Sequence, residues 1–356
     1  MCRASSGPVQ GIGELQVSIV IPMRNEESHV AACLDSILPQ LDDLDDAEVL
    51  CVDGMSKDNT RQIVAEYANR DGRVVLVENP ERIVPTGMNK AIQMAKGDVI
   101  VRLDCHAKYA SDYLSSCLEV LQRTGADNVG GYVTTLPARN THVGRAIAAA
   151  TSSPAGAGGS TFRTSGEERE ADTVPFGCFR RDVFDRFGMY DERLVRNQDI
   201  ELNSRIKKAG GKIVISPSIK LTYYTRSTFR GLRQQAFFNG LWNPYTLYLV
   251  GGGLRLRHLV PLGFVVSLLV LAVAGVFYWP IWVILAAELA LYLSACTAAS
   301  IKAAKEDAVS WPLVLLSLVQ LHLAYGVGSL WGVLTAPIKF GLRKSSRAAA
   351  LPDRRD

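Results

Sequence analysis

The sequence lacks the cysteine pairs and glycine-rich turns that would assign it to several common classes of protein. Its 7 cysteines are scattered along 356 residues without a C-x-x-C pair, which predicts neither a zinc site nor a disulfide framework and favours a reducing compartment. It contains no G-x-x-x-x-G-K-[ST] sequence, and the turn after Met23 reads Arg-Asn-Glu-Glu instead of G-x-G-x-x-G. P-loop and Rossmann dinucleotide chemistry are therefore excluded.

An excess of one charge is also missing. The chain has 39 Lys and Arg against 35 Asp and Glu, a formal net charge of +4, and the two signs are nearly balanced before residue 259. Nucleic-acid binding needs a clustered basic stripe, so no nucleic-acid partner is expected. Residues 1–14 contain no apolar signal-peptide run, so we expect a flexible N-terminus and a following domain that stays in the cytoplasm.

Charged residues almost disappear from the C-terminal part of the chain. Residues 259–300 contain one charged side chain, Glu288, and 311–338 contain none. Each hydrophobic run approaches the roughly 20 residues of a membrane-spanning helix, which predicts a multi-pass protein. The basic tail at 339–356 fits the cytoplasmic side only if the third run is re-entrant, so two and three spans both stay open. The expected transmembrane region, 259–338, contains the runs 259–278, 281–300 and 311–337.

Before residue 227, short β-branched runs alternate with helical stretches. Continuous Val, Ile and Leu runs separated by helices predict an α/β domain with a mostly parallel sheet flanked by helices. We expect this domain at 15–226, an amphipathic, interfacial segment at 227–258, and a mobile, lid-like loop at 152–172. The predicted strands are 17–23, 47–53, 73–77, 98–104, 128–135 and 212–216, and the predicted helices are 27–38, 58–69, 86–96, 110–123, 143–151, 180–187 and 200–209.

Acidic residues stand where predicted strands end. Asp53 closes one strand and Asp104 another, and parallel strands end at the edge of the sheet where ligands bind. Each aspartate alone is equally well explained as a cap of the next helix. Two of them on one edge, with Glu26 on the first turn, favour a metal or nucleotide site. Asp104 and His106 can direct a carboxylate and an imidazole at one divalent cation, Mn²⁺ or Mg²⁺.

Five sequence blocks occur in a characteristic order. They read VSIVIPMRNE from residue 17, VDGMSKDNT from 52, GMNKA from 87, GDVIVRLDCH from 97 and NQDIEL from 197. In this order, over roughly residues 15–245, the chain resembles the family-2 inverting glycosyltransferases, which have the GT-A nucleotide-sugar-binding fold. Its Asp-x-His-Ala motif at 104–107 and its hydrophobic tail are most similar to the succinoglycan-biosynthesis glucosyltransferases of bacterial exopolysaccharide pathways.

The resemblance implies roles for the matching residues. Asp104 and His106 stand where the family's D-x-D motif holds metal and diphosphate, with His replacing the second carboxylate. Asp199 matches the catalytic Asp of the Glu-Asp motif, with Gln198 replacing Glu; from the residues alone a helix N-cap is preferred for Asp199. Asp53 would accept a hydrogen bond from uracil. The residues implied to surround the nucleotide sugar are Pro22, Asn25, Glu26, Asp53, Lys57, Asn89, Asp104 and Gly177.

The Q-x-x-R-W motif of processive synthases in this family is not met before Trp242, which favours addition of a single sugar over polymerisation. Arg230, Arg233 and Trp242 would close over the diphosphate or the acceptor. An equally good alternative is that they belong to an interfacial helix whose arginines meet lipid phosphates.

The function implied is inverting transfer of one sugar, glucose from UDP-glucose, onto a lipid-linked saccharide carried by a polyprenyl diphosphate. Asp199 would take the proton of the acceptor hydroxyl while a divalent cation neutralises the departing UDP. Anchoring in the inner (plasma) membrane, among its lipids, raises encounters with an acceptor confined to the bilayer. Two alternatives stay open: transfer to a polyprenyl phosphate, as in the dolichyl-phosphate-mannose synthases, and a non-catalytic membrane subunit that keeps the fold for assembly.

Overall fold

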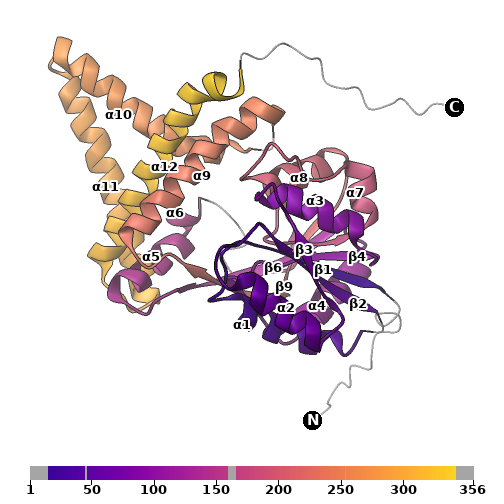
Figure 1. Ribbon diagram of the computed structural model, residues 1–356. Helices are drawn as coiled ribbons and strands as arrows, with labels where there is room; N and C mark the ends of the chain where they lie inside the picture. Colours follow the sequence, from indigo (N-terminus) through magenta and orange to yellow (C-terminus); the bar gives the residue numbers. More distant parts are fainter. Residues whose placement is uncertain (1–14, 45, 159–165, 253, 342–356) are drawn as a thin grey trace.

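The structure, a computed structural model, describes residues 15–44, 46–158, 166–252 and 254–341. The predicted flexible N-terminus, nearly all of the basic tail and the centre of the predicted loop at 152–172 lie outside these residues. Figure 1 shows an α/β domain beside a group of long helices from the C-terminal part of the chain. The site predicted from the sequence belongs to the α/β domain.

One half of the sheet is parallel. In it, β3 pairs with β2, β2 with β1 and β1 with β4. The bounds of β1 and β2 agree with prediction, because both strands are mostly buried and contain a run of apolar residues. These strands are β1 (Val17–Met23), β2 (Ala47–Asp53), β3 (Val74–Glu78) and β4 (Val99–Arg102).

The other half of the sheet is mixed. β8 joins the two halves by antiparallel pairing with β4 and β6, and β6 runs parallel to β9, which carries β5 and β7 in antiparallel pairs. The sequence pattern missed β5, β7 and β8 because runs of two or three residues show no periodicity, and β9 is much longer than predicted. These strands are β5 (Ala107–Tyr109), β6 (Asn128–Pro137), β7 (Arg169–Glu170), β8 (Cys178–Arg180) and β9 (Ile213–Thr225).

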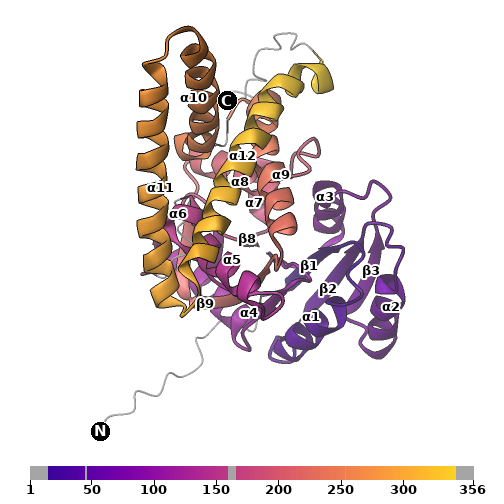
Figure 2. The same cartoon turned by 90° about the vertical axis from the view of Figure 1, so that its left-hand side faces the viewer.

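Helices cover both faces of the sheet (Figure 2). Successive side chains of β1 point to opposite faces of the sheet and so belong to two hydrophobic cores. Ile19 and Ile21 pack toward α1, α2 and α4, whereas Val20 packs toward α3, α7 and α8. Full burial of each such side chain contributes about 1.5–3 kcal/mol to folding. The helices are α1 (Val30–Ile37), which continues into the 3₁₀ turn Leu38–Leu41, α2 (Thr60–Arg70), α3 (Val84–Met94), α4 (Tyr113–Thr124), α7 (Asp182–Phe187) and α8 (Gln198–Lys208).

The predicted loop at 152–172 is wrong at both ends. A serine cap and a proline start a short helix, α6 (Pro154–Ala157), since Ser153 accepts a hydrogen bond from the Gly156 amide. At the other end β7 pairs with β9. The helix before the loop, α5 (His142–Ser152), packs its alanines against two C-terminal helices, α11 (Ile281–Glu306) and α12 (Trp311–Phe340).

Three C-terminal helices are long and apolar enough to cross a membrane: Leu256–Phe277, Ile281–Glu306 and Trp311–Phe340. They contain α10 (Val260–Phe277), α11 (Ile281–Glu306) and α12 (Trp311–Phe340). Many of their large apolar side chains face outward; Phe277, for example, is 85% exposed. Such a surface suits lipid better than water.

The region expected to be an interfacial segment contains a long helix, α9 (Phe229–Val250), that lies along α12 (Figure 2). Glycines let the two backbones approach closely. A Cβ on Gly240 would come within 2.0 Å of the Tyr325 carbonyl oxygen, and one on Gly328 within 2.1 Å of the Phe237 carbonyl oxygen. One face of α9 is therefore a helix–helix interface.

Candidate active site

The turn after β1 and the turn after β2, at the carboxyl edge of the sheet, are hydrogen-bonded to each other. The Asn25 amide donates to Ser56 Oγ at 2.8 Å, and Asn25 Oδ1 accepts from the Lys57 amide at 2.9 Å. Asn25 has a φ of 56°, a conformation that asparagine tolerates better than most residues. The Glu26 amide donates to Thr60 Oγ1 at 2.8 Å. Three predicted nucleotide residues, Asn25, Glu26 and Lys57, therefore lie on two connected turns.

Asp53 lies beneath these turns and is fully buried. Its Oδ2 accepts a hydrogen bond from the Ser56 amide at 3.0 Å and lies 3.8 Å from Arg61 Nε. Pro22 is half-buried and pairs in register with Val52, one residue before Asp53. The carboxylate therefore stabilises the second turn, and its bond to uracil stays a prediction.

Asp104 and His106 face each other just after β4. His106 Nε2 lies 3.9 Å from Asp104 Oδ2, and His106 Nδ1 lies 3.7 Å from Glu26 Oε1. The interaction with the Glu26 carboxylate raises the pKa of His106 against the opposing effect of burial, and the charge of Asp104 adds to the rise. A carboxylate and an imidazole this close fit one divalent cation, although no group of three or more such side chains converges on a metal position within the described residues.

Arg102 was not predicted as a site residue from the sequence. This arginine closes β4, is almost fully buried, and forms ion pairs with Asp199 and, at 3.4 Å, with Asp104. Burial alone would lower the pKa of Arg102, but the two carboxylates raise it well above its usual range. The signal was a single charged residue in the otherwise apolar run VIVRL, since such a residue needs a buried partner.

Asp199 is the second residue of α8, and Asn197 is the N-cap. The helix therefore begins two residues before its predicted start, and the interpretation of Asp199 as the cap is wrong. Its side chain is about one-third exposed, so the carboxylate remains accessible beside Arg102. A carboxylate in the first helical turn is also stabilised by the helix dipole.

Hydrogen bonds connect the start of α8 to the long helices. Asn197 Nδ2 donates to Asn243 Oδ1 of α9 at 3.0 Å, and Asn243 Nδ2 donates to the hydroxyl of Tyr325 on α12. The neighbouring Arg196 donates to Asn239 of α9 at 2.9 Å. The position of Asp199 thus depends on α9 and α12 as well as on the sheet.

Two other predicted residues support this region. Gly177 has a φ of +80°, and its carbonyl oxygen accepts the Arg102 amide at 3.0 Å. A side chain there would be strained and would meet the ring of Phe179. Asn89 is buried and forms two hydrogen bonds with the backbone of Tyr190, in the segment before α8. Its Nδ2 donates to the Tyr190 carbonyl oxygen, and its Oδ1 accepts from the Tyr190 amide. Their contacts with a nucleotide stay predictions.

Among the residues that the structure describes, the predicted arginines and tryptophan of α9 form no hydrogen bond or ion pair with Arg102 or its two carboxylate partners. Arg230 is exposed, and Arg233 donates to Gln320 of α12. Trp242 is buried between α9 and α12, with the Lys339 ammonium 5.4 Å from its ring. A cation closer to the site is Arg226, whose charge offsets part of the rise in the pKa of His106.

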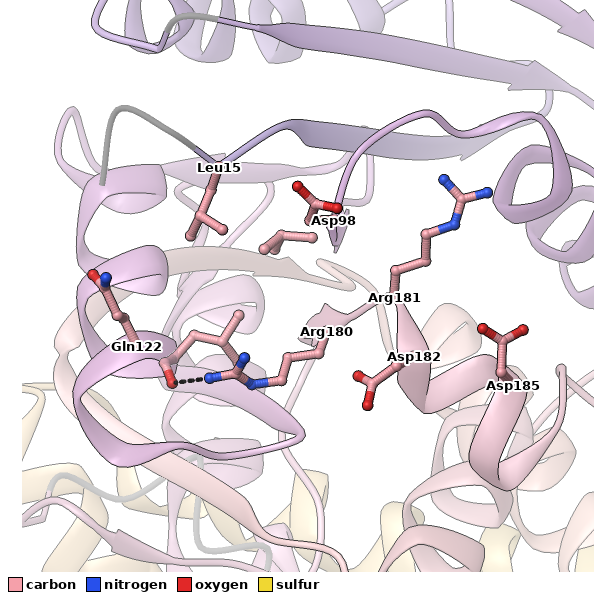
Figure 3. Close-up of a pocket in the computed structure, with 9 residues that line it drawn as sticks. Leu15, Asp98, Gln122, Arg180, Arg181, Asp182 and Asp185 are labelled. Carbon is pink, nitrogen blue, oxygen red and sulfur yellow. Dashed lines mark hydrogen bonds between the residues drawn. The ribbon is translucent and has the colours of Figure 1, made fainter. Parts of the chain in front are cut away.

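A cavity of about 450 Å³ lies at the opposite edge of the sheet. Figure 3 shows its charged lining, in which Arg180 donates to a backbone carbonyl oxygen. Asp98 lines it and directly precedes β4, whereas Asp104 follows that strand. In parallel sheets ligands bind at the carboxyl edge, so this cavity is not the active-site candidate.

The sheet and the acidic groups at its carboxyl edge define a GT-A-like glycosyltransferase. Residues 18–188 match the family described as Glycosyl transferase family 2. The chain is 31% identical over 313 residues to the succinoglycan biosynthesis protein ExoA of Rhizobium meliloti (strain 1021), covering 87% of this chain and 92% of that protein. The protein therefore belongs to glycosyltransferase family 2, and the fold and enzyme class predicted from the sequence are confirmed.

Two further comparisons agree. Dolichyl N-acetyl-alpha-D-glucosaminyl phosphate 3-beta-D-2,3-diacetamido-2,3-dideoxy-beta-D-glucuronosyltransferase of Methanococcus voltae is 27% identical over 267 residues, covering 73% of this chain and 82% of that protein. The mannosyltransferase PcManGT of Pyrobaculum calidifontis, solved in complex with GDP-Man and Mn²⁺, aligns with a TM-score of 0.59 at 19% identity, covering 89% and 87% of the two chains. The latter likeness concerns the fold.

Proposed function

We propose that this enzyme transfers a single sugar, glucose from UDP-glucose, with inversion onto a lipid-linked saccharide carried by a polyprenyl diphosphate. The observation that carries the proposal is the pair of contacts from Arg102 to Asp104 and Asp199. Through these contacts Asp199, which is suited to proton removal, lies beside Asp104, which is suited to metal and diphosphate binding. The two carboxylates are far apart in the sequence.

The acceptor class is supported by the relatives and by the long helices. The Methanococcus voltae relative is named for a dolichyl-phosphate-linked saccharide, and the Rhizobium meliloti relative for succinoglycan biosynthesis. Three helices here are apolar enough to cross a membrane. We place the enzyme in the plasma membrane with its α/β domain on the cytoplasmic side, where it meets a substrate confined to the bilayer.

In the proposed reaction, Asp199 accepts the proton of the acceptor hydroxyl. The hydroxyl oxygen forms a bond to the anomeric carbon as the bond from that carbon to the diphosphate breaks, and UDP leaves with the electron pair. Arg102 orients the Asp199 carboxylate, and the two turns around Asn25 and Asp53 hold the nucleotide. A divalent cation, which Asp104 and His106 would hold, supplies charge neutralisation for the diphosphate when bound.

The alternative acceptor, a polyprenyl phosphate, differs in its nucleophile. A phosphate monoester is already largely ionised at neutral pH, because its second pKa is about 6, and needs no general base. The Arg102–Asp199 pair therefore favours a hydroxyl acceptor. A non-catalytic subunit is set aside because the family and its relatives indicate a glycosyltransferase.

UDP release by the detergent-purified protein tests this function. UDP- and GDP-sugars are compared with Mn²⁺ or Mg²⁺, with and without lipid extract, for the wild type and Asp199→Asn. We expect release from UDP-glucose that requires lipid extract and falls about 10²–10⁴-fold in the variant. Asp182→Asn, in the first turn of α7, is the matched control. Full activity of Asp199→Asn would show that Asp199 is not the base, and preference for another sugar would overturn the assigned donor.

A further inference from the structure

A cavity of about 640 Å³ lies between the α/β domain and the C-terminal helices. Its volume falls within the range of roughly 300–1,000 Å³ that ligand sites occupy. At one end it is lined by Asn197 and Ile200, which flank Asp199 in the sequence, and by Tyr223, whose ring lies edge-on to that of His106 at 5.8 Å. The cavity therefore opens beside the proposed base and metal ligand.

The other end of the cavity is apolar. Phe264 of α10, Tyr292 of α11 and Leu321 of α12 line it, and all three helices are candidates to cross the membrane. His322 also lines this end, but both ring nitrogens are occupied: Nε2 lies 3.1 Å from the Ala155 carbonyl oxygen and Nδ1 lies 3.1 Å from the Tyr292 hydroxyl. This histidine therefore has a structural role, because it connects α12 to α6 and α11 by hydrogen bonds.

Between the two ends the lining is cationic. Arg257 lines the cavity, whereas no Asp or Glu does so among the described residues. Within the same part of the chain Arg257 forms no ion pair, and its Nε is buried without a hydrogen-bond partner. The nearby Arg255, by contrast, pairs with Asp172. A partly buried guanidinium without a carboxylate calls for an anionic ligand, and its planar group of donors matches phosphate oxygens.

His258 adds a donor at the same place. Its Nδ1 accepts the Arg255 amide at 3.0 Å, so the neutral ring carries its hydrogen on Nε2. Because His258 lines the cavity next to Arg257, the two side chains offer adjacent N–H groups. Their position lies between the start of α8 and the apolar end formed by the long helices.

We propose that this cavity binds the phosphate groups and the first isoprene units of the polyprenyl carrier, with Arg257 and His258 contacting phosphate oxygens. The proposal rests on the proposed function for the nature of the acceptor. With its phosphate groups at Arg257, the carrier would have its polyprenyl chain among α10, α11 and α12. The attached saccharide would then point toward Asp199. The cavity thus assigns the acceptor lipid a binding site separate from that of the donor.

Binding of geranylgeranyl diphosphate to the full-length protein in detergent tests the proposal without any transfer reaction. We expect Arg257→Gln to weaken binding at least tenfold, Arg257→Lys to weaken it less, and Arg255→Gln to leave it unchanged. Geranylgeraniol, which lacks the phosphates, and inorganic diphosphate, which lacks the chain, should each bind far more weakly. UDP binding, measured on every variant, shows that the α/β domain is intact.

Two results would overturn the proposal: unchanged binding of geranylgeranyl diphosphate to Arg257→Gln, or equal binding of phosphatidylglycerol, which would make the cavity a general site for anionic lipids. Neither result affects the UDP-release test of Asp199→Asn, so failure of the cavity proposal is distinguishable from failure of the proposed function.

Discussion

Arg102 shows how one side chain can organise a candidate active site. Its guanidinium is almost buried and contacts carboxylates from two elements, Asp104 after β4 and Asp199 at the start of α8. A buried charge is tolerated only when it is paired, so the arginine and the carboxylates position one another. The sequence block at 97–106 contains this arginine. Hydropathy alone could not show that it contacts Asp199, which lies 97 positions further along the chain.

We expect Arg102→Met to leave two carboxylates without their partner and to lower the free energy of unfolding by about 3–5 kcal/mol. Arg102→Lys keeps the charge but cannot contact two carboxylates in the same fork, so kcat should fall more than KM rises. Thermal unfolding and steady-state kinetics measure the two effects. A lysine variant with unchanged kcat would contradict the positioning role.

His106 offers a test of the proposed metal site. We expect His106→Asp, which creates the family's usual D-x-D pattern, to shift the preference from Mn²⁺ toward Mg²⁺, because carboxylate oxygen suits Mg²⁺ better than imidazole nitrogen does. The ratio of activities with the two metals measures the shift. His142→Asp, at an exposed position in the first turn of α5, is the control and should leave the ratio unchanged.

At the scale of elements, the interface between α9 and α12 depends on glycine. We expect Gly240→Ala to lower the stability of the protein by about 1–3 kcal/mol, because the added methyl group meets the Tyr325 backbone. Gly263→Ala in α10, where the space is open, should have no such cost. Thermal unfolding in detergent compares them, and equal midpoints would show that the helices separate easily.

Elements were predictable where their pattern was long. Continuous apolar runs located β1, β2 and the three hydrophobic helices, because burial or lipid on all sides leaves few polar residues. The short strand β8, which overlaps the predicted helix at 180–187 only at Arg180, was missed because three residues show no period. Asp53 and Asp104 were identified by position at strand ends. Arg102, Arg257 and the bond from Asn197 to Asn243 were not, because each depends on contacts distant in the sequence.

For the whole molecule, the outward apolar surface predicts firm attachment to membranes. We expect the full-length protein to remain in the membrane fraction after washing with high salt and with alkaline carbonate, since three apolar helices insert far more strongly than charged surfaces bind. Immunoblotting of the washed membranes measures this. Release by salt alone would mean that the helices cover one another or another protein instead of contacting lipid.

The bond from Asn197 through Asn243 to Tyr325 has a consequence for the enzyme's surroundings. A helix that crosses a bilayer adjusts its tilt to the thickness of the hydrocarbon layer. Asn243 of α9 is hydrogen-bonded both to Tyr325 of α12 and to Asn197, which lies two residues before Asp199. We therefore expect a change in the tilt of α12 to move the proposed base. In vesicles made from lipids of increasing acyl length, transfer should therefore pass through an optimum, and Asn197→Ala should flatten it. We therefore expect the thickness of the membrane to influence the reaction rate.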